Sequence, residues 1–372
     1  MSSIILYFQP FLITFIFSLV LTKALILFSR KYNNCHFEPD RVRNLNACKW
    51  LKLQISRFTR NDKIAFYNNS QKNITRFGGV AIITSFLLTI FLSGDLVFDN
   101  LKWGIVISSV IILFFGLYDD FKNLSWKQQL FGQVVVVLVM IYAGLQVDYI
   151  ANPFSGPEFR LDVFQYSIFN IQYSILGSLF ILFWIIGFMN VMNWLDGLDG
   201  LAGGVAFIGM VTLFFLSISG LVNQPPLGII SITVAGAILG FLVFNFNLAK
   251  IFMGTSGSMF LGFILAVLAI FSGGKIATAL LVMGFPILDA FWVIAQRIKA
   301  GKSPFEGDTR HLHYKLLERG WSQKKVVLFI YFICLIFGVS AILFQSLGKF
   351  VVLLFLFVFS YFILTRVLRE KV

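Results

Sequence analysis

The sequence is poor in charged residues. Only 13% of its 372 residues are Asp, Glu, Lys or Arg, against about a quarter in an average soluble domain. A chain of this length could form two or three soluble domains, but it has too few charged groups to cover their surfaces. Together with a hydrophobic fraction of 58%, the low charge excludes a soluble protein and excludes disorder over most of the chain.

Cysteine and histidine are both scarce, with three residues of each type. Cys334 lies in an apolar run, whereas Cys35 and Cys48 lie in a basic loop. This odd number of cysteines at unrelated positions does not form a disulfide scaffold, and we expect no structural disulfide.

Long apolar runs are abundant, and the mean hydropathy is +0.86. The runs are continuously apolar rather than alternating, which disfavours a membrane β-barrel and favours helices of about 20 residues. The first run is too long for a signal-peptide core, has no basic segment before it, and is therefore expected to be a retained helix. The eleven predicted spans are 4–28, 77–94, 101–118, 130–147, 171–189, 201–221, 227–245, 257–272, 275–296, 325–345 and 349–367.

These spans predict an all-α polytopic membrane protein with a single membrane-embedded domain over residues 1–372. Two connections are long, 29–76 and 297–324. Residues 44–71 of the first are basic, which suits a leaflet rich in anionic lipid.

The basic residues predict the orientation in the membrane. When the loops are numbered alternately, 25 of the 30 Lys and Arg residues fall on one side and four on the other. The positive-inside rule then places the N-terminus outside and the C-terminus in the cytoplasm. The net charge of +13 is explained by this asymmetry, so we do not expect a nucleic-acid partner.

The same topology brings four polar stretches to the cytoplasmic face: 118–120, 190–204, 245–257 and 307–320. The first contains the adjacent carboxylates Asp119 and Asp120, which need a compensating cation. Mg²⁺ suits hard oxygen ligands and often binds through one or two carboxylates plus substrate phosphates. If this pair stood alone, a solvated turn would be the preferred interpretation over a metal site.

In the second stretch, Asn190, Asn193 and Asp196 recur every three residues and can share one helical face, and Asp199 continues the series. A run so rich in Asn, Asp and Gly between apolar helices is costly unless it lines a wet cavity. The alternative is an ordinary loop with helix caps.

The third stretch contains Asn245 and the sequence Phe252-Met-Gly-Thr-Ser-Gly-Ser, which indicates a helix N-terminus suited to phosphate. Plain capping by Ser256 or Ser258 would give the same pattern.

The fourth stretch holds Arg310, His311 and His313, which could neutralise phosphate charge. A metal site formed by the two histidines is a minor alternative, because no cysteine is near. A further carboxylate, Asp289, is intramembrane and either functional or a structural hydrogen-bond partner.

As a set, these motifs resemble the integral-membrane polyprenyl-phosphate N-acetylhexosamine-1-phosphate transferases, a family that includes the phospho-MurNAc-pentapeptide translocase. The resemblance runs from about Arg76 to Gly320, and compared with the family residues 44–71 look like an insertion in the connection 29–76. It implies transfer of a HexNAc-1-phosphate from a UDP-sugar to undecaprenyl phosphate, with release of UMP, at the bacterial inner membrane. It also implies Mg²⁺, with Mn²⁺ as the alternative ion, and is compatible with a homodimer. UDP-GlcNAc is the leading donor, and the product would start a cell-envelope glycan such as lipopolysaccharide.

The resemblance also implies residue roles. The catalytic candidates are Asp119, Asp120, Asp196, His311 and His313. The metal candidates are Asp119, Asp120 and Asp196. The substrate-binding candidates are Lys72, Asn190, Asn193, Asp199, Asn245, Phe252 and Arg310.

One departure from the family pattern bears directly on activity. Thr255 stands where the family has an aspartate that ligates Mg²⁺, and a hydroxyl is a weaker ligand for a hard dication. A catalytically impaired relative that binds substrates or scaffolds an envelope-synthesis complex is therefore the second hypothesis. A secondary transporter is the third, and the absence of internal repeats and the one-sided polar groups count against it.

Overall fold

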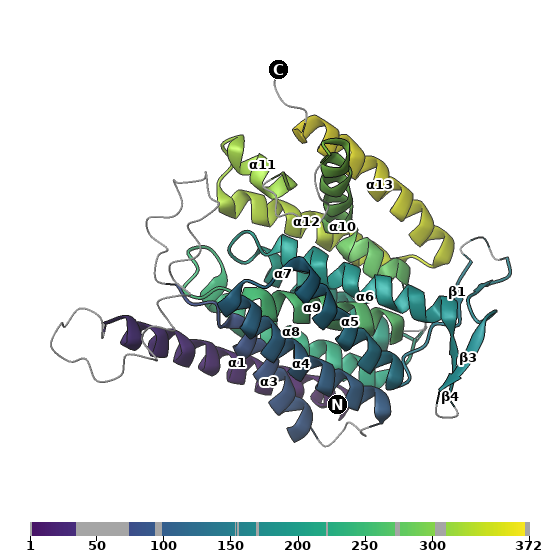
Figure 1. The fold of residues 1–372 in the computed structure, drawn as a ribbon, viewed down its shortest axis with the longest axis horizontal. Coiled ribbons are helices and arrows are strands. Elements are labelled where there is room, and N and C mark those ends of the chain that lie inside the picture. The colour runs from purple at the N-terminus through teal and green to yellow at the C-terminus, as the bar shows by residue number, and fades with distance from the viewer. Residues whose placement is uncertain are drawn as a thin grey trace.

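The structure is a computed structural model of the chain, and it describes residues 2–34, 74–93, 99–152, 154, 156–168, 171–220, 222–271, 276–301 and 310–368. Cys35, Cys48, Lys72 and the predicted insertion 44–71 lie outside these residues. The described part is a bundle of helices with two small hairpins at one end (Figure 1).

Each of the eleven predicted spans corresponds to a helix. These are α1 (Ser2–Asn34), α3 (Gly78–Leu92), α4 (Asn100–Lys122), α5 (Trp126–Tyr142), α6 (Ile175–Leu195), α7 (Leu201–Ile218), α8 (Pro225–Asn245), α9 (Gly254–Phe271), α10 (Ile276–Lys299), α12 (Gln323–Leu343) and α13 (Ser346–Leu368). Among the described helices, nine are long and apolar enough to cross a membrane, and α3 and α5 are shorter apolar helices. The all-α polytopic fold is confirmed, and the count of eleven spans stays a prediction.

Two details of the predicted pattern are wrong. Residues 171–174 were expected to begin a span, but they form β4 (Ile171–Ser174), which pairs antiparallel with β3 (Gln165–Ile168). The alternation of apolar and polar residues over these four positions is typical of a strand, and Ser174 then caps α6 by accepting from the Gly177 N–H at 3.0 Å. A second hairpin joins β1 (Tyr149–Ile150) to β2 (Phe159–Arg160).

The connection 297–324 is not entirely irregular either, because it contains the short helix α11 (Leu312–Glu318). Seven residues are too few to give a clear hydrophobic period. The short helix therefore left no signal in the apolar pattern, although it carries the histidine motif.

Helix α9 forms the centre of the molecule. It contacts α3, α4, α6 and α7, and side chains such as Phe260 and Phe263 are completely buried. A helix that is apolar on all sides is expected in such a central position. Helix α4 passes α9 so closely that a Cβ on Gly116 would lie 2.3 Å from the Ser256 Cα. This contact holds the last turn of α4 against the first turn of α9.

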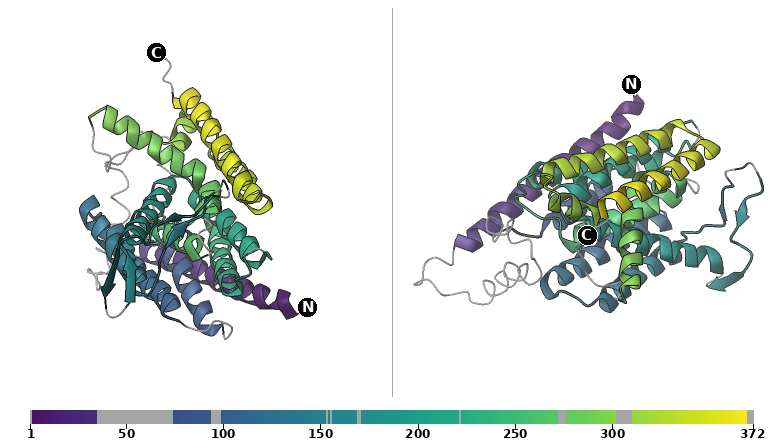
Figure 2. Two further views of the ribbon diagram at one scale, coloured as in Figure 1. Left: turned by 90° about the vertical axis from the view of Figure 1, so that its right-hand side faces the viewer. Right: turned by 90° about the horizontal axis from the view of Figure 1, so that it is seen from above.

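Helices α1 and α13 lie on the outside of the bundle (Figures 1 and 2). They leave large apolar side chains exposed, among them Phe8, Val20, Phe355 and Val358. A soluble protein rarely exposes such continuous apolar surface, so these faces are explained by contact with lipid.

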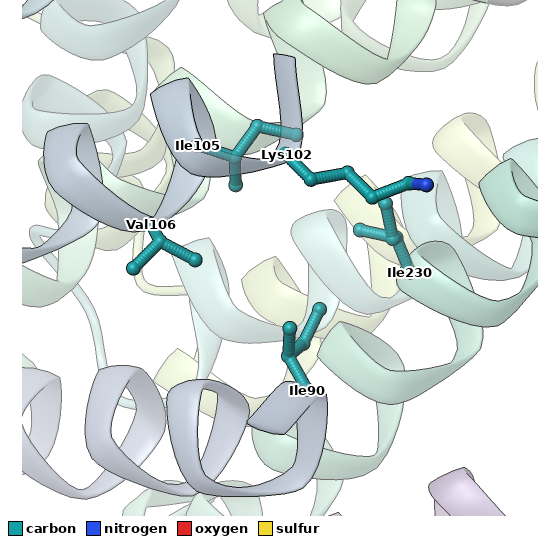
Figure 3. Close-up of a pocket in the computed structure, with 5 residues that line it drawn as sticks. All are labelled: Ile90, Lys102, Ile105, Val106 and Ile230. Carbon is teal, nitrogen blue, oxygen red and sulfur yellow. The ribbon is translucent and has the colours of Figure 1, made fainter. Parts of the chain in front are cut away.

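A small apolar pocket lies between α3, α4 and α8 (Figure 3) and is lined by Ile90, Lys102, Ile105, Val106 and Ile230. Lys102 is in the first turn of α4, whereas Asp119 and Asp120 are in the last. At 1.5 Å per residue the two ends are roughly 26 Å apart. The pocket therefore lies at the end of α4 that is remote from the predicted site.

Candidate active site

The carboxylates at the end of α4 are buried and hydrogen-bonded. Asp119 is 5% exposed and Asp120 is 6% exposed. Asp120 accepts from the Thr255 backbone N–H at 3.0 and 3.1 Å, and so caps the N-terminus of α9. Asp119 accepts from the Leu124 N–H at 2.8 Å and from the Gln129 amide at 3.0 Å. The pair therefore joins three helices, α4, α5 and α9, because each buried carboxylate needs such donors.

The first turn of α9 confirms the predicted helix N-terminus, but its cap differs from the expected one. Gly254 has a φ of 76°, and a Cβ there would lie 2.6 Å from the Asp120 Oδ2. Ser256 and Ser258 lie inside the first turn rather than before it. The cap comes from Asp120, which is 135 positions away in the sequence from Thr255, so local sequence could not reveal it.

The segment that precedes α3 is tied to the same turn by backbone hydrogen bonds. Gly78 N–H donates to the Phe252 carbonyl at 2.9 Å, Gly79 N–H donates to the Met253 carbonyl at 2.7 Å, and Phe252 N–H donates to the Thr75 carbonyl at 2.8 Å. These contacts fix the position of Arg76, whose guanidinium acts electrostatically on both Asp120 and Asp196.

Helix α6 carries Asn190 and Asn193 in its last turns, with Asp196 as its C-terminal cap residue. Asn193 accepts from the Ser258 hydroxyl at 2.9 Å, which joins α6 to α9. Asn190 exchanges hydrogen bonds with Gln133 of α5, at 3.0 and 3.3 Å. The regular spacing of these residues thus places them on the face of α6 that meets α5 and α9.

Asp199 and Asn245 hold the neighbouring loops together. The side-chain Oδ1 of Asn245 accepts from the Gly200 N–H at 2.9 Å, and its Nδ2 donates to the Ile251 carbonyl at 2.8 Å. Asp199 accepts from the Ala249 N–H at 3.0 Å. Both side chains therefore give the loops at 196–200 and 246–251 one fixed arrangement.

The histidine motif lies against the Asp196 loop. A Cβ on Gly197 would lie 2.6 Å from His313 Nε2 and 2.5 Å from the Tyr314 hydroxyl. The rings of His311 and His313 are stacked, with centroids 5.7 Å apart. His311 bonds to Asp289 of α10 through Nδ1 at 2.9 Å. A structural hydrogen bond was one of the two interpretations that the sequence left open for Asp289.

Burial distinguishes the two histidines. His313 is 1% exposed, and burial lowers its pKa to about 3 against a weak opposing effect of Asp289. Its Nε2 is buried and has no hydrogen-bond partner in the described part of the chain. At neutral pH His313 is therefore uncharged and offers a hydrogen-bonding atom to the site rather than positive charge.

The charges around Asp196 bear on the predicted metal. Burial raises the pKa of Asp196 to about 8, the Arg76 guanidinium opposes this, and the Asp120 and Asp199 carboxylates add to it. Among the described residues, no three His, Cys, Asp or Glu side chains gather as a complete metal site. Asp120 and Asp196 nevertheless fit a Mg²⁺ ion that takes its other ligands from water and substrate phosphates. The assignment of Asp119, Asp120 and Asp196 as metal ligands stays a prediction.

The structure thus brings the four predicted stretches together, as far as it describes them. Phe252 is held by backbone hydrogen bonds to Thr75 and Gly78, and Arg310 directly precedes His311. Lys72 lies outside the described residues.

Residues 102–273 match glycosyl transferase family 4. The chain is 32% identical over 312 residues to a Bacillus subtilis protein described as a probable undecaprenyl-phosphate N-acetylglucosaminyl 1-phosphate transferase, covering 81% of this chain and 83% of the relative. This chain belongs to glycosyl transferase family 4. The resemblance to polyprenyl-phosphate hexosamine-1-phosphate transferases is thereby confirmed.

Two other relatives of this family 4 protein align over a smaller share of the chain. One is the decaprenyl-phosphate N-acetylglucosaminephosphotransferase of Mycobacterium tuberculosis, 32% identical over 284 residues, or 69% of this chain and 68% of the relative. The other is the phospho-N-acetylmuramoyl-pentapeptide-transferase of Anoxybacillus flavithermus, 31% identical over 281 residues, or 71% of this chain and 82% of the relative.

Two residues that hold parts of the family 4 site in place were not predicted from the sequence. Gln133 holds Asn190, and Tyr331 of α12 donates its hydroxyl to the Gly200 carbonyl. Gln133 could have been found, because a polar residue inside an apolar helix is functional by default. Tyr331 gave no such signal, because tyrosine is common in membrane helices.

Proposed function

We propose that this protein transfers N-acetylhexosamine 1-phosphate from a UDP-N-acetylhexosamine, with UDP-GlcNAc as the donor, to undecaprenyl phosphate. An oxygen of the lipid phosphate forms a bond to the β-phosphorus of the donor. The bond from that phosphorus to the bridging oxygen breaks, and its electron pair leaves with UMP. The product is a lipid-linked diphosphate sugar that starts a cell-envelope glycan.

One observation carries the proposal: the carboxylates of α4 and α6, the first turn of α9 and the histidines of α11 meet at one end of the bundle. Asp120 contacts Thr255, Asn193 contacts Ser258, and His313 lies against Gly197. Two phosphorylated substrates repel one another, so their reaction requires positive groups held in place beforehand. The relatives' names point to the same reaction.

The residues of the site have different proposed roles. Asp120 and Asp196 would hold Mg²⁺, which when bound offsets the charge of the diphosphate. Arg76 and Arg310 add positive charge, and the neutral His313 presents Nε2 to the sugar diphosphate. Asn190, Asn193, Asp199 and Asn245 shape the nucleotide pocket by fixing its walls, and Phe252 stacks on the uracil.

The membrane orientation is part of the proposal. With the N-terminus outside, the site opens to the cytoplasm of a bacterial cell, where nucleotide sugars are made, and the lipid carrier approaches from the inner membrane. The basic residues support this orientation because 25 of 30 fall on the side that carries the site.

The family relationship gives no support to the hypothesis of a secondary transporter. The names of the similar proteins give no support to the hypothesis that this chain is catalytically impaired. Thr255 keeps the contact with Asp120 through its backbone N–H, which any residue except proline would supply at this position. The smaller number of carboxylates predicts weaker Mg²⁺ binding rather than loss of the fold.

The test is UMP release by the purified full-length protein with undecaprenyl phosphate and Mg²⁺, measured for a panel of UDP-N-acetylhexosamines. We expect UDP-GlcNAc to give the fastest release, and we expect no release without the lipid phosphate. Absence of UMP with every donor in the panel would refute the proposed function. Faster release with another donor would change only the choice of sugar.

A further inference from the structure

Asp289 is a buried carboxylate that binds the segment at the start of α11. It lies on α10, is 6% exposed, and uses both oxygens on consecutive residues. Its Oδ2 bonds to His311 Nδ1 at 2.9 Å, and its Oδ1 accepts from the Leu312 backbone N–H at 2.9 Å. Burying a carboxylate costs several kcal/mol before its partners offset the loss of water. A carboxylate that fixes both the ring and the backbone of its partner determines how that ring is oriented.

The bond to Asp289 decides which nitrogen of His311 faces the site. An ionised carboxylate only accepts, so Nδ1 must carry a proton. The imidazole then presents Nε2 on its opposite edge. Within the described residues this Nε2 has no hydrogen-bond partner. The ring lies between Trp194, at 6.3 Å between centroids, and His313, at 5.7 Å.

The two histidines are therefore built differently. Within the described residues His313 is neutral and has no carboxylate partner, whereas His311 has the Asp289 carboxylate at Nδ1. A carboxylate behind an imidazole fixes the tautomer and the orientation of the ring.

We propose that Asp289 is a positioning residue of the transfer reaction: it accepts from the Nδ1–H of His311 and fixes the ring, so that the Nε2 edge is held towards a phosphate group of the nucleotide sugar. The proposal rests on the proposed function for the identity of the phosphate. The orientation of the ring does not depend on it.

The first experiment compares Asp289→Asn, His311→Asn and the double variant in the full-length protein. Asn has the shape of Asp but turns an amide group towards one of the two N–H donors, so the ring loses its fixed orientation. We expect kcat to fall roughly 10- to 100-fold, as for other residues that orient a functional imidazole, with KM for the nucleotide sugar changed less than about threefold.

The double variant separates positioning from a general structural role. If Asp289 acts through His311, the double variant has the activity of His311→Asn alone. Effects that multiply would overturn the proposal. Glu318→Gln is the matched control, because Glu318 is on the same short helix, pairs with Lys315 at 2.9 Å and is exposed. We expect it to keep the parent kcat.

A second experiment does not require the Asp289 variant to fold. The chain has only three histidines, so nitrogen-15 labelling of histidine gives an NMR spectrum with three ring systems. The signals that vanish in His311→Asn belong to His311. We expect them to show a protonated Nδ1 in the parent protein, and an unprotonated Nδ1 would overturn the proposal. A parent protein that releases no UMP would refute the proposed function, while the spectrum would still decide the role of Asp289.

Discussion

At the scale of single residues, Thr255 is the position at which the proposed Mg²⁺ site differs from the family pattern. Its backbone N–H donates to Asp120, and its side chain brings no charge. Thr255→Asp adds a carboxylate beside Asp120, and carboxylate number sets affinity for hard dications. We expect the variant to lower the Mg²⁺ concentration for half-maximal UMP release by roughly tenfold. Thr255→Asn, which adds no charge, is the control, and an equal shift in both variants would contradict the metal assignment.

Asn245 shows how a side chain can be essential through its hydrogen bonds alone. It is 3% exposed and both ends of its amide are used. Asn245→Asp keeps the bond to Gly200 but turns an oxygen towards the Ile251 carbonyl. Leaving such buried groups unpaired costs about 1–3 kcal/mol, so we expect a lower midpoint of thermal unfolding in detergent.

The matched control for this variant is Asn247→Asp, the same substitution two positions along the chain at an exposed residue. We expect its unfolding midpoint to equal that of the parent protein. If both variants unfold at the parent temperature, Asn245 does not hold the loops together as the structure indicates.

At the scale of elements, the contact between α4 and α9 positions the two aspartates. Gly116 lies one turn before Asp119 and Asp120, with no room for a Cβ against the Ser256 backbone. Gly116→Ala should push the helices apart, cost about 1–3 kcal/mol, and reduce UMP release because Asp120 loses its place at α9. Unfolding and activity are measured on the same preparation.

Gly187→Ala provides the comparison for a glycine in a membrane helix. Gly187 is on the exposed face of α6 and has open space around it. Alanine is the better helix former by about 0.5–1 kcal/mol, so this variant should be as stable as the parent or more so. Loss of activity in Gly187→Ala to the same extent would argue against a specific role for the α4–α9 contact.

The apolar pattern predicted the nine long apolar helices and the two shorter ones that the structure describes, because a run of about 20 apolar residues has few other stable forms in a membrane. It did not separate the strand at Ile171–Ser174 from the apolar run that follows, because an alternation over four residues is short, and the seven residues of α11 give no clear hydrophobic period. The polar stretches were also recognisable in sequence. Their partners were not, because Asp120 with Thr255 and Asp289 with His311 are long-range pairs.

At the scale of the whole molecule, the two hairpins lie at one end of the bundle, just before the start of α6 (Figure 1). Asn190, Asn193 and Asp196 of the site lie at the opposite end of the same helix. The proposed orientation therefore places the hairpins outside the cell. Val163, in the connection between β2 and β3, is 66% exposed, and Leu248, beside the site, is 77% exposed. In a chain whose Cys35 and Cys48 are changed to Ser, we expect an impermeant maleimide to label Val163→Cys in intact spheroplasts.

Leu248→Cys should be labelled only after the membrane is opened. Labelling of Leu248→Cys, but not of Val163→Cys, in intact spheroplasts would reverse the orientation, and the positive-inside count would then be misleading for this chain.

The central claim is that the protein transfers a sugar phosphate rather than a sugar. The most direct measurement supplies UDP-GlcNAc radiolabelled at the β-phosphate to the purified protein with undecaprenyl phosphate and Mg²⁺, and then separates lipid from water-soluble products. We expect label in the lipid fraction, with unlabelled UMP released in equal amount. Label that stays in the water-soluble fraction as UDP, or a lipid fraction without label, would contradict it.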